Sequence, residues 1–418
     1  MRIWLTQTSE PYPFLPGVSS MRTGNLAAEL VRRGHEVVWW GSNIEHRRKQ
    51  PLEAGVYEIA PGYTVRLLAV PPYTRNVSWR RYRGYKQLAR AFERESRALP
   101  EPDVIVAGLP VHDLAWAAVR YASGREIPSL VDVRDLWPDY FVDLLPPGLR
   151  TLGRVALRDD FHRARFALSN ATGIIGISKS YLEWGLDVAG RSAREADSVF
   201  FLGCNPLGPV DAAPVPLRRD RKVFGFLGVF GHTYDLETVI AAARILHESG
   251  DDRAHFALAG TGDFFERVSR AAEGLPNVSL PGWLDAAGVD SFLRGIDVGL
   301  AAYAAGAPQS LPNKPFQYFA AGAPVVSSLG GEFRDLLAAT GTGVTYRAGD
   351  PESLAEAVRR FLDAPGLIDE MGKRAHSHFR ASFDARVIYP RLADHVELVA
   401  AVLQGQVDVA SAAVGGGT

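Results

Sequence analysis

Residues 309–326 read QSLPNKPFQYFAAGAPVV and contain a complete helix-to-strand unit. The pattern predicts a polar turn up to Pro312, a short helix, a stop at Gly322 and Pro324, and then a buried strand. The first turn of a helix carries unpaired backbone N–H groups and the positive end of the helix dipole, so it favours an anion. Lys314 would be unfavourable in that turn unless a doubly negative group, such as a diphosphate, lay between its ammonium and the amides. The alternative is a surface lysine on an amphipathic helix.

Short apolar runs alternate with helix-period segments over the whole chain, which predicts βαβ units and mostly parallel sheets. The fold class is therefore α/β. In the first half the predicted strands are residues 2–7, 36–40, 104–107, 129–132 and 173–177. In the second half they are residues 223–227, 255–259, 278–280, 298–301, 324–327 and 343–346.

The length of 418 residues predicts two domains, because one hydrophobic core rarely serves so long a chain. Residues 205–222 are rich in proline and polar residues, so we expect a linker between an N-terminal domain, 1–204, and a C-terminal domain, 223–384. A helix over 385–404 is expected to pack back on the first domain, and 405–418 to form a flexible tail. Two doubly wound sheets joined in this way are expected to bind a ligand in a cleft between their carboxyl strand ends.

Composition excludes several classes of protein. The net charge of −1 argues against a dedicated nucleic-acid binder, so no nucleic-acid partner is expected. The single cysteine, Cys204, excludes an internal disulfide and a thiolate metal cluster, and it fits a reducing compartment. The N-terminus lacks the apolar core of a signal peptide, and no run of about eighteen apolar residues could span a membrane. We therefore expect a cytoplasmic protein.

In the first half, polar residues follow several predicted strands. Ser20 is a candidate N-cap for a helix over 26–33, and Gly17 could bring backbone amides close to a ligand, although a tight turn needs the same residues. No complete G-x-G-x-x-G pattern is present, which makes a nicotinamide or flavin dinucleotide site improbable. His112 and Asp113 follow the strand 104–107 and could face an acceptor hydroxyl, but a lone histidine is weak evidence.

Arg134 and Asp135 stand at the carboxyl end of the strand 129–132, where a ligand is expected. The alternative is a structural ion pair between them that braces the turn at Trp137 and Pro138.

Residues 75–97 combine a basic face with aromatic and apolar residues at helical spacing. That pattern suits peripheral contact with an anionic membrane surface, or with a lipid diphosphate acceptor. The alternative is a solvated basic face on a helix that covers a domain core.

Two glycine turns follow the first strands of the second half. Gly231, His232 and Thr233 come after the strand 223–227, and their amides, with the imidazole, could meet a phosphate. Gly260 and Gly262 follow the next strand, where bare glycine backbone permits close approach. Either segment could be only a turn.

These pieces, in this order, resemble the retaining glycosyltransferases of family four, which have the GT-B architecture of two facing doubly wound, Rossmann-like domains. The similarity covers nearly the whole chain. It is clearest in three segments, residues 20–30, 132–138 and 312–325.

The resemblance implies transfer of a sugar from a nucleoside diphosphate donor, held by the C-terminal domain, to a hydroxyl acceptor held by the N-terminal domain. It also implies retention of configuration and no metal or other cofactor. UDP is the default nucleotide, and the acceptor is lipid-linked or soluble. The residues assigned to catalysis are Lys314, Gln309 and Arg134. The residues assigned to the donor are Gly17, Gly231, His232, Thr233, Gly260, Gly262, Ser310, Leu311, Pro312, Asn313 and Gln317, and those assigned to the acceptor are Ser20, Arg22, His112 and Asp135.

Two departures from the family pattern keep other functions open. The paired glutamates of the family correspond to Gln309 and Gln317, and its arginine and lysine at the glycine turn correspond to His232 and Tyr234. A glutamine still accepts hydrogen bonds from ribose hydroxyls but adds no negative charge. The alternatives are a catalytically silent sugar-nucleotide-binding protein and a sugar-nucleotide epimerase of the same architecture.

Overall fold

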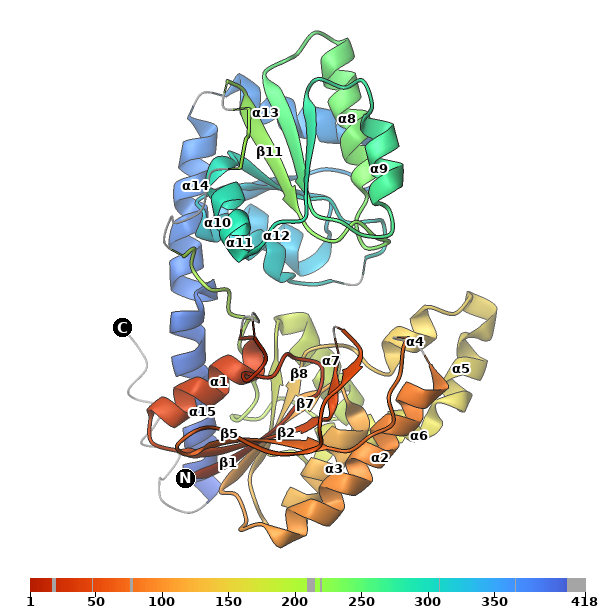
Figure 1. The fold of residues 1–418 in the computed structure, drawn as a ribbon, viewed down its shortest axis with the longest axis vertical. Coiled ribbons are helices and arrows are strands. Elements are labelled where there is room, and N and C mark those ends of the chain that lie inside the picture. Colours follow the sequence, from red (N-terminus) through yellow and green to blue (C-terminus); the bar gives the residue numbers. More distant parts are fainter. Residues whose placement is uncertain are drawn as a thin grey trace. The chain divides into compact units, whose positions relative to one another are not determined.

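The chain folds into two compact α/β units in a computed structural model. The residues that the structure describes are 1–16, 20–46, 48–75, 78–208, 215–218, 220–307, 309–364 and 366–403. Unit 1 comprises Met1–Phe201 and the chain from Ile388 onward, and unit 2 comprises Leu202–Val387 (Figure 1). Gly17 and the predicted tail 405–418 lie outside the described residues. Within the described part, no helix is long and apolar enough to cross a membrane.

Unit 1 is built on a sheet with the strand order β10-β9-β8-β7-β1-β2-β6-β5. Its strands are β1 (Arg2–Thr6), β2 (Glu36–Ser42), β5 (Gly55–Ala60), β6 (Tyr63–Leu68), β7 (Val104–Leu109), β8 (Ser129–Val133), β9 (Gly173–Gly176) and β10 (Ser198–Val199). All neighbours are parallel except β5, which runs antiparallel to β6. A separate antiparallel pair consists of β3 (Ile44–Glu45) and β4 (Gln50–Pro51). The central strands are buried on both faces, which explains their continuous apolar sequence.

Helices cover this sheet. They are α1 (Arg22–Arg32), α2 (Trp79–Glu95), η1 (Ser96–Ala98), α3 (His112–Ser123), α4 (Asp139–Asp143), η2 (Pro147–Leu149), α5 (Arg150–Ala156), α6 (Arg158–Asn170) and α7 (Lys179–Ala189). The helix α15 (Ala385–Leu403) begins in unit 2 and continues into unit 1. There Arg33, at the end of α1, donates to Asp394 and Glu397 of α15 at 2.6 and 2.8 Å.

The apolar face of α2 lies in the core of unit 1. Tyr85, Leu88 and Phe92 are buried, and Phe92 meets the rings of Trp4 and Trp40 edge-on at 6.1 and 5.1 Å. Aromatic rings packed in this way contribute beyond their buried area. The apolar face of α2 from Tyr85 onward is therefore a core element, as the alternative interpretation holds, whereas Trp79 at the start of the helix and the basic face are exposed.

Unit 2 is built on an all-parallel sheet with the order β13-β12-β11-β14-β15-β16. Its strands are β11 (Lys222–Leu227), β12 (Ala254–Ala259), β13 (Val278–Gly282), β14 (Val298–Ala301), β15 (Val325–Ser327) and β16 (Gly343–Thr345). Its helices are α8 (Leu236–Glu248), α9 (Phe265–Ala272), α10 (Ala286–Gly295), α11 (Asn313–Ala320), α12 (Gly331–Thr340), α13 (Pro351–Asp363), α14 (Leu367–His378) and the π-helical turn η3 (Phe379–Phe383). The strand order reverses between β11 and β14, and such a switch point is where open α/β sheets bind ligands.

Candidate functional site

The loops that leave β11 and β14 meet at the switch point of unit 2. The Asp235 N–H donates to the Ala302 carbonyl at 3.0 Å, and the Ala304 N–H donates to the Thr233 carbonyl at 3.0 Å. These bonds hold the glycine turn after β11 beside the segment that leads into α11. They also engage the Thr233 carbonyl within the protein.

Lys314, the second residue of α11, places its ammonium at this switch point. Nζ lies 4.6 Å from the ring centre of Tyr234 and 5.5 Å from that of Phe226. A Cβ added at Gly228 would overlap Nζ, so the ammonium rests directly over the glycine backbone. Among the described residues no carboxylate forms a salt bridge with Lys314. Burial lowers the pKa of this lysine to about 8, because the charged form is partly desolvated.

The N-terminus of α11 has no side-chain cap. Pro312 precedes the helix in an extended conformation, and no side chain of the described residues accepts a hydrogen bond there as an N-cap. In contrast, the Asp235 carboxylate caps α8 by accepting the Thr238 N–H at 3.1 Å, and Glu10 does the same for α1. Among the described residues, the positive end of α11 therefore has no side-chain cap, whereas those of α8 and α1 are occupied by carboxylates of the chain.

Polar side chains around the start of α11 complete the site. The Gln309 Oε1 and Asn313 Oδ1 atoms are buried without a hydrogen-bond partner among the described residues. Buried acceptors of this kind are uncommon and require a donor, which a ligand hydroxyl would supply. Ser310 Oγ donates to Glu332 Oε2 at 2.8 Å, which brings a carboxylate from the first turn of α12 to this loop. Glu332 was not among the predicted site residues, although it is an acidic residue directly after the glycine pair that follows β15.

The remaining residues of this loop differ in exposure. Leu311 is buried and Gln317 is half-buried on α11. His232 is exposed, and its ring packs edge-on against Phe264 at 4.5 Å. The imidazole therefore leans toward the loop after β12.

The glycines after β12 have a structural reason within unit 2. Gly260 and Gly262 have φ angles of 137° and 152°, and a Cβ at either would overlap the Gly228 or Phe230 carbonyl oxygen. Their small size lets this turn pack against the turn after β11, where Phe230 N–H donates to the Thr261 carbonyl at 2.9 Å. Gly231 differs, because no described heavy atom lies within 4 Å of a Cβ added there. Of these turns, only that at Gly231 borders open space.

Arg22 and Arg134 belong to a buried ionic network in unit 1. The Arg22 guanidinium donates to both oxygens of Asp132, at 2.8 and 3.0 Å. Arg134 donates to Asp132 at 2.8 Å and also contacts Glu10. Burial alone would raise the pKa of Asp132, but the arginines outweigh it and hold this pKa below its usual range. Both predicted ligand arginines are thus engaged by acceptors of the protein.

The alternative of an ion pair between Arg134 and Asp135 is wrong. Asp135 instead accepts the backbone N–H of Leu136 at 2.9 Å, and burial raises the pKa of its carboxyl group. Arg134 pairs instead with Asp132, two residues before it, and with Glu10, which is distant in sequence.

The predicted N-cap at Ser20 is also wrong. The helix α1 begins at Arg22, four residues earlier than expected, with Met21 as its N-cap residue and no side-chain cap from it. The cap comes from Glu10, whose carboxylate accepts the Thr23 N–H at 2.8 Å and the Thr23 hydroxyl at 3.0 Å. A carboxylate pairs better than a hydroxyl with the positive end of a helix. Ser20 is exposed, and its role toward an acceptor stays a prediction.

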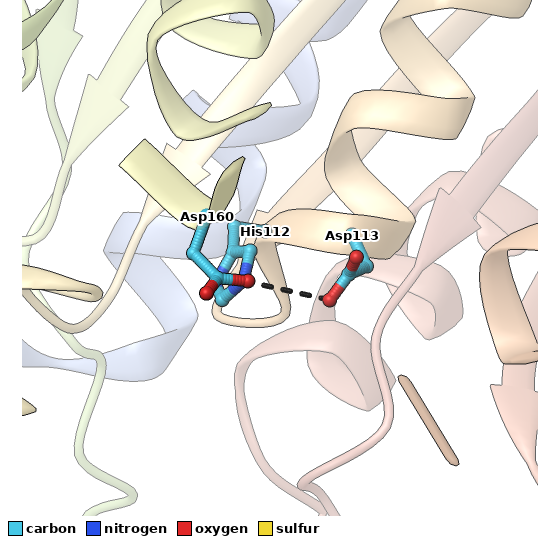
Figure 2. Close-up of side chains that lie close together, drawn as sticks. All are labelled: His112, Asp113 and Asp160. Atoms are coloured by element: carbon cyan, nitrogen blue, oxygen red, sulfur yellow. Dashed lines mark hydrogen bonds and ion pairs between the residues drawn. The ribbon is translucent and has the colours of Figure 1, made fainter. Parts of the chain in front are cut away.

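His112 lies in a cluster with Asp113 and Asp160, at the starts of α3 and α6 (Figure 2). Its Nε2 is 2.8 Å from Asp160 Oδ1 and 3.4 Å from Asp113 Oδ2. These three side chains offer donors close enough for a metal ion. Arg163 contacts Asp113, and Lys86 Nζ lies 3.7 Å from Asp160. The two carboxylates are therefore balanced by two cations of the chain, and the cluster does not require a metal.

His112 also lines a cavity of about 250 Å³, here called the α2–α6 cavity. Its wall is largely apolar and aromatic. The lining residues are Ser78, Arg81, Tyr82, Tyr85, His112, Trp137, Pro138, Phe141, Leu157 and Asp160. The Arg81 guanidinium lies over the rings of Tyr85 and Trp137, at 5.3 and 5.5 Å. Sequence reasoning missed this cavity, because its lining comes from segments far apart in the chain.

Two protein-family models match the chain. The model described as a glycosyl transferase 4-like domain matches residues 19–196, and the model described as glycosyl transferases group 1 matches residues 221–364. Together the two matches span more than half of the chain. A comparison with curated protein sequences gives no significant match.

Solved structures share the fold over nearly the full length. Sucrose-phosphate synthase from Thermosynechococcus elongatus is 17% identical, with a TM-score of 0.72 over 96% of this chain and 99% of its own. An α,α-trehalose-phosphate synthase (UDP-forming) from Burkholderia vietnamiensis is 14% identical, with a TM-score of 0.68 over 97% of this chain and 98% of its own. HepE from Anabaena, in complex with UDP, is 13% identical, with a TM-score of 0.64 over 95% of this chain and 99% of its own. These similarities show the GT-B fold, and with the two family models they lead to one conclusion: the chain belongs to the group 1 glycosyl transferases and is a glycosyltransferase.

Proposed function

We propose that this glycosyltransferase moves a sugar from a UDP-sugar to a hydroxyl acceptor, with retention of anomeric configuration and without a metal ion. The observation that carries the proposal is the Lys314 ammonium. It is mostly buried, it has no carboxylate partner among the described residues, and it rests at the switch point of the unit 2 sheet. An unpaired buried charge is costly, so this arrangement is best explained by an anionic ligand that binds there.

The positive groups of unit 2 suit a diphosphate leaving group. When the bond between the sugar and the diphosphate breaks, negative charge develops on a phosphate oxygen. Lys314 would stabilise this charge, together with the free amides at the start of α11 and those at Gly231. Fixed donors in a partly desolvated site are worth much more than the same donors in water.

The buried amide oxygens offer positions for hydroxyl groups of the donor. Gln309 Oε1 and Asn313 Oδ1 can each accept a hydrogen bond from a sugar or ribose hydroxyl. Gln317 is placed one helical turn further along α11, where it can serve the ribose. Retention follows from the resemblance to family four, in which the departing phosphate oxygen itself takes the acceptor proton.

UDP is supported by the nucleotides found with proteins of the same fold. HepE is described in complex with UDP and with UDP-glucose, and the Burkholderia trehalose-phosphate synthase is described as UDP-forming. For the acceptor, the α2–α6 cavity of unit 1 offers aromatic walls with Arg81, His112 and Asp160 as polar groups. We assign the acceptor to unit 1 on this ground, and not to Arg22 or Arg134, which are engaged internally.

A panel of nucleotide sugars tests the proposal. A ligand that binds only the folded chain raises its melting temperature, so a UDP-sugar should raise Tm more than the matching GDP- or ADP-sugar. The best donor is then incubated with the chain in the absence of acceptor. Slow release of UDP supports the enzyme, whereas binding without any release would favour a silent binding protein. Retention is checked by NMR of the anomeric proton in the product.

A further inference from the structure

One short segment of unit 1 concentrates exposed apolar side chains. Leu144, Leu149, Leu152 and Val155 are 62%, 49%, 66% and 61% exposed. They lie where α4, η2 and α5 follow each other, and Figure 1 shows α4 and α5 projecting at one end of unit 1. Single exposed apolar residues are ordinary, but a contiguous group marks contact with another surface.

The local packing directs this apolar face outward. Gly153 is the buried residue of α5, and a Cβ there would overlap the Leu145 side chain. Leu149, Leu152 and Val155 recur every three residues, so successive members are neighbours along the helical segment, and all three are exposed. The large apolar side chains of this segment therefore face solvent.

Basic residues accompany the apolar ones. Residues 144–158 contain Arg150, Arg154 and Arg158 and no acidic residue. Each of these arginines pairs with an aspartate, since Asp143, Asp139 and Asp159 lie 3.7, 2.7 and 3.6 Å from Arg150, Arg154 and Arg158 and offset their charge.

The exposed start of α2 lies at the same end of unit 1. Trp79 is 64% exposed and stacks on Tyr82 at 5.3 Å. Tyr82 in turn donates to Asp160 of α6 at 2.9 Å, which joins the start of α2 to the helix that follows α5. Arg80 and Arg83 are exposed beside Trp79, and neither forms a salt bridge with a carboxylate of the described residues.

We propose that these apolar residues, Trp79, Leu144, Leu149, Leu152 and Val155, form a docking surface for an anionic lipid bilayer. Apolar side chains facing outward between exposed arginines are the pattern of interfacial membrane binding, because the apolar groups enter the bilayer and the cations meet lipid phosphates. The buried apolar face of α2 takes no part; only its basic side and Trp79 contribute.

The docking surface also lies close to the α2–α6 cavity. Leu157 and Phe141, which line this cavity, belong to the same helical segments as the docking surface. A chain docked in this way would present the cavity next to lipid headgroups, so the acceptor we infer is a lipid-linked hydroxyl compound. Binding to the bilayer itself does not depend on the donor chemistry and can be measured without a sugar nucleotide.

Co-sedimentation of the full chain with vesicles tests the inference. Vesicles of phosphatidylcholine alone are compared with vesicles of equimolar phosphatidylcholine and phosphatidylglycerol. The chain should bind the anionic vesicles, and the double variant Leu152→Ser with Val155→Ser should lower the partition coefficient at least about tenfold. The matched control is Val56→Ser, which removes a side chain that is 55% exposed on β5 and should change nothing.

A second variant removes charge and leaves the apolar residues in place. Arg80→Gln with Arg83→Gln should lower binding to anionic vesicles by about fivefold for each charge removed, and should leave binding to neutral vesicles unchanged. Circular dichroism and thermal melting verify that each variant is folded.

Several outcomes would overturn the proposal. They are no binding of the wild-type chain to anionic vesicles, equal binding by the Leu152/Val155 variant, or an equal loss in Val56→Ser. A dimer seen by light scattering and dissolved by the Leu152/Val155 variant would assign the surface to a second copy of the chain instead.

Discussion

Unit 1 and unit 2 both bury cations, but only in unit 1 are the buried cations discussed here paired with carboxylates. In unit 1, Arg22 and Arg134 are held inside the protein by the carboxylates of Asp132 and Glu10. In unit 2, Lys314 is covered by aromatic rings and glycine backbone and meets no carboxylate of the described residues. Pairing indicates a cation that stabilises the fold, and the lack of a partner indicates a cation kept for a ligand.

The strongest test of this difference is Lys314→Met, with Lys373→Met as the matched control on the exposed face of α14. We expect transfer to fall by about 10³-fold or more in Lys314→Met, because the leaving group loses its fixed cation. Folding stability should rise, by about 1–2 kcal/mol at neutral pH, because a desolvated charge is removed. Activity assays and urea unfolding measure the two effects. A variant that kept most of its activity would remove Lys314 from the reaction.

The opposite result is expected in unit 1 for Asp132→Asn. This change weakens the bonds of two buried guanidinium groups at once, so the free energy of unfolding should fall by about 3–5 kcal/mol. Asp135→Asn is the control, because its carboxylate accepts the Leu136 N–H and has no arginine partner in the part of the chain described here. Urea unfolding at neutral pH compares the two. Equal stabilities would mean that the arginine network is not a structural element.

Glycines at the switch point should also differ, some being required for packing and others not. Gly260→Ala places a methyl group against the Gly228 carbonyl at a φ angle of 137°, and should cost about 2 kcal/mol or more. Gly231→Ala meets open space and should change stability by less than about 0.5 kcal/mol. Thermal melting of both variants checks this. Similar losses in both would show that Gly231 is also required for packing.

The smallest effect concerns pH. Lys314 has a pKa of about 8 in the folded chain, below the 10.5 of an ordinary lysine, so the unfolded chain binds more protons between these values. Stability should therefore rise with pH across this window, since burial penalises the charged form below it. Binding of UDP raises the pKa again, so affinity should be constant just below pH 8 and fall by at most about tenfold for each pH unit above it. Calorimetry should show no such fall in Lys314→Met.

The sequence predicted most of the architecture, because buried parallel strands are continuous apolar runs. The strand predicted at 255–259 differs from β12 by one residue, and that at 298–301 agrees with β14. The hairpin of β5 and β6 was missed, since β5 is largely exposed and β6 alternates buried and half-buried residues over most of its length, so neither strand is a continuous apolar run. Its β5 strand has no clear alternation of buried and exposed residues either.

The candidate site was predictable only where its residues are close in sequence. Lys314 and Gln309 stand within one loop and its helix, so their grouping follows from local pattern alone. The bonds of Arg22 to Asp132 and of Arg134 to Glu10 join residues more than a hundred positions apart, and no local pattern encodes them. The sequence therefore shows that these arginines are charged, but it does not show which distant carboxylates they pair with.

Gly228 leaves room for the ammonium that we propose binds the diphosphate. The Lys314 ammonium fits in its position because Gly228 has only a hydrogen atom in place of a side chain. A methyl group added at this position would overlap the Lys314 ammonium and displace it. The substitution would change no ionisable group. Gly228→Ala would therefore displace the Lys314 ammonium while every charged residue of the chain is kept.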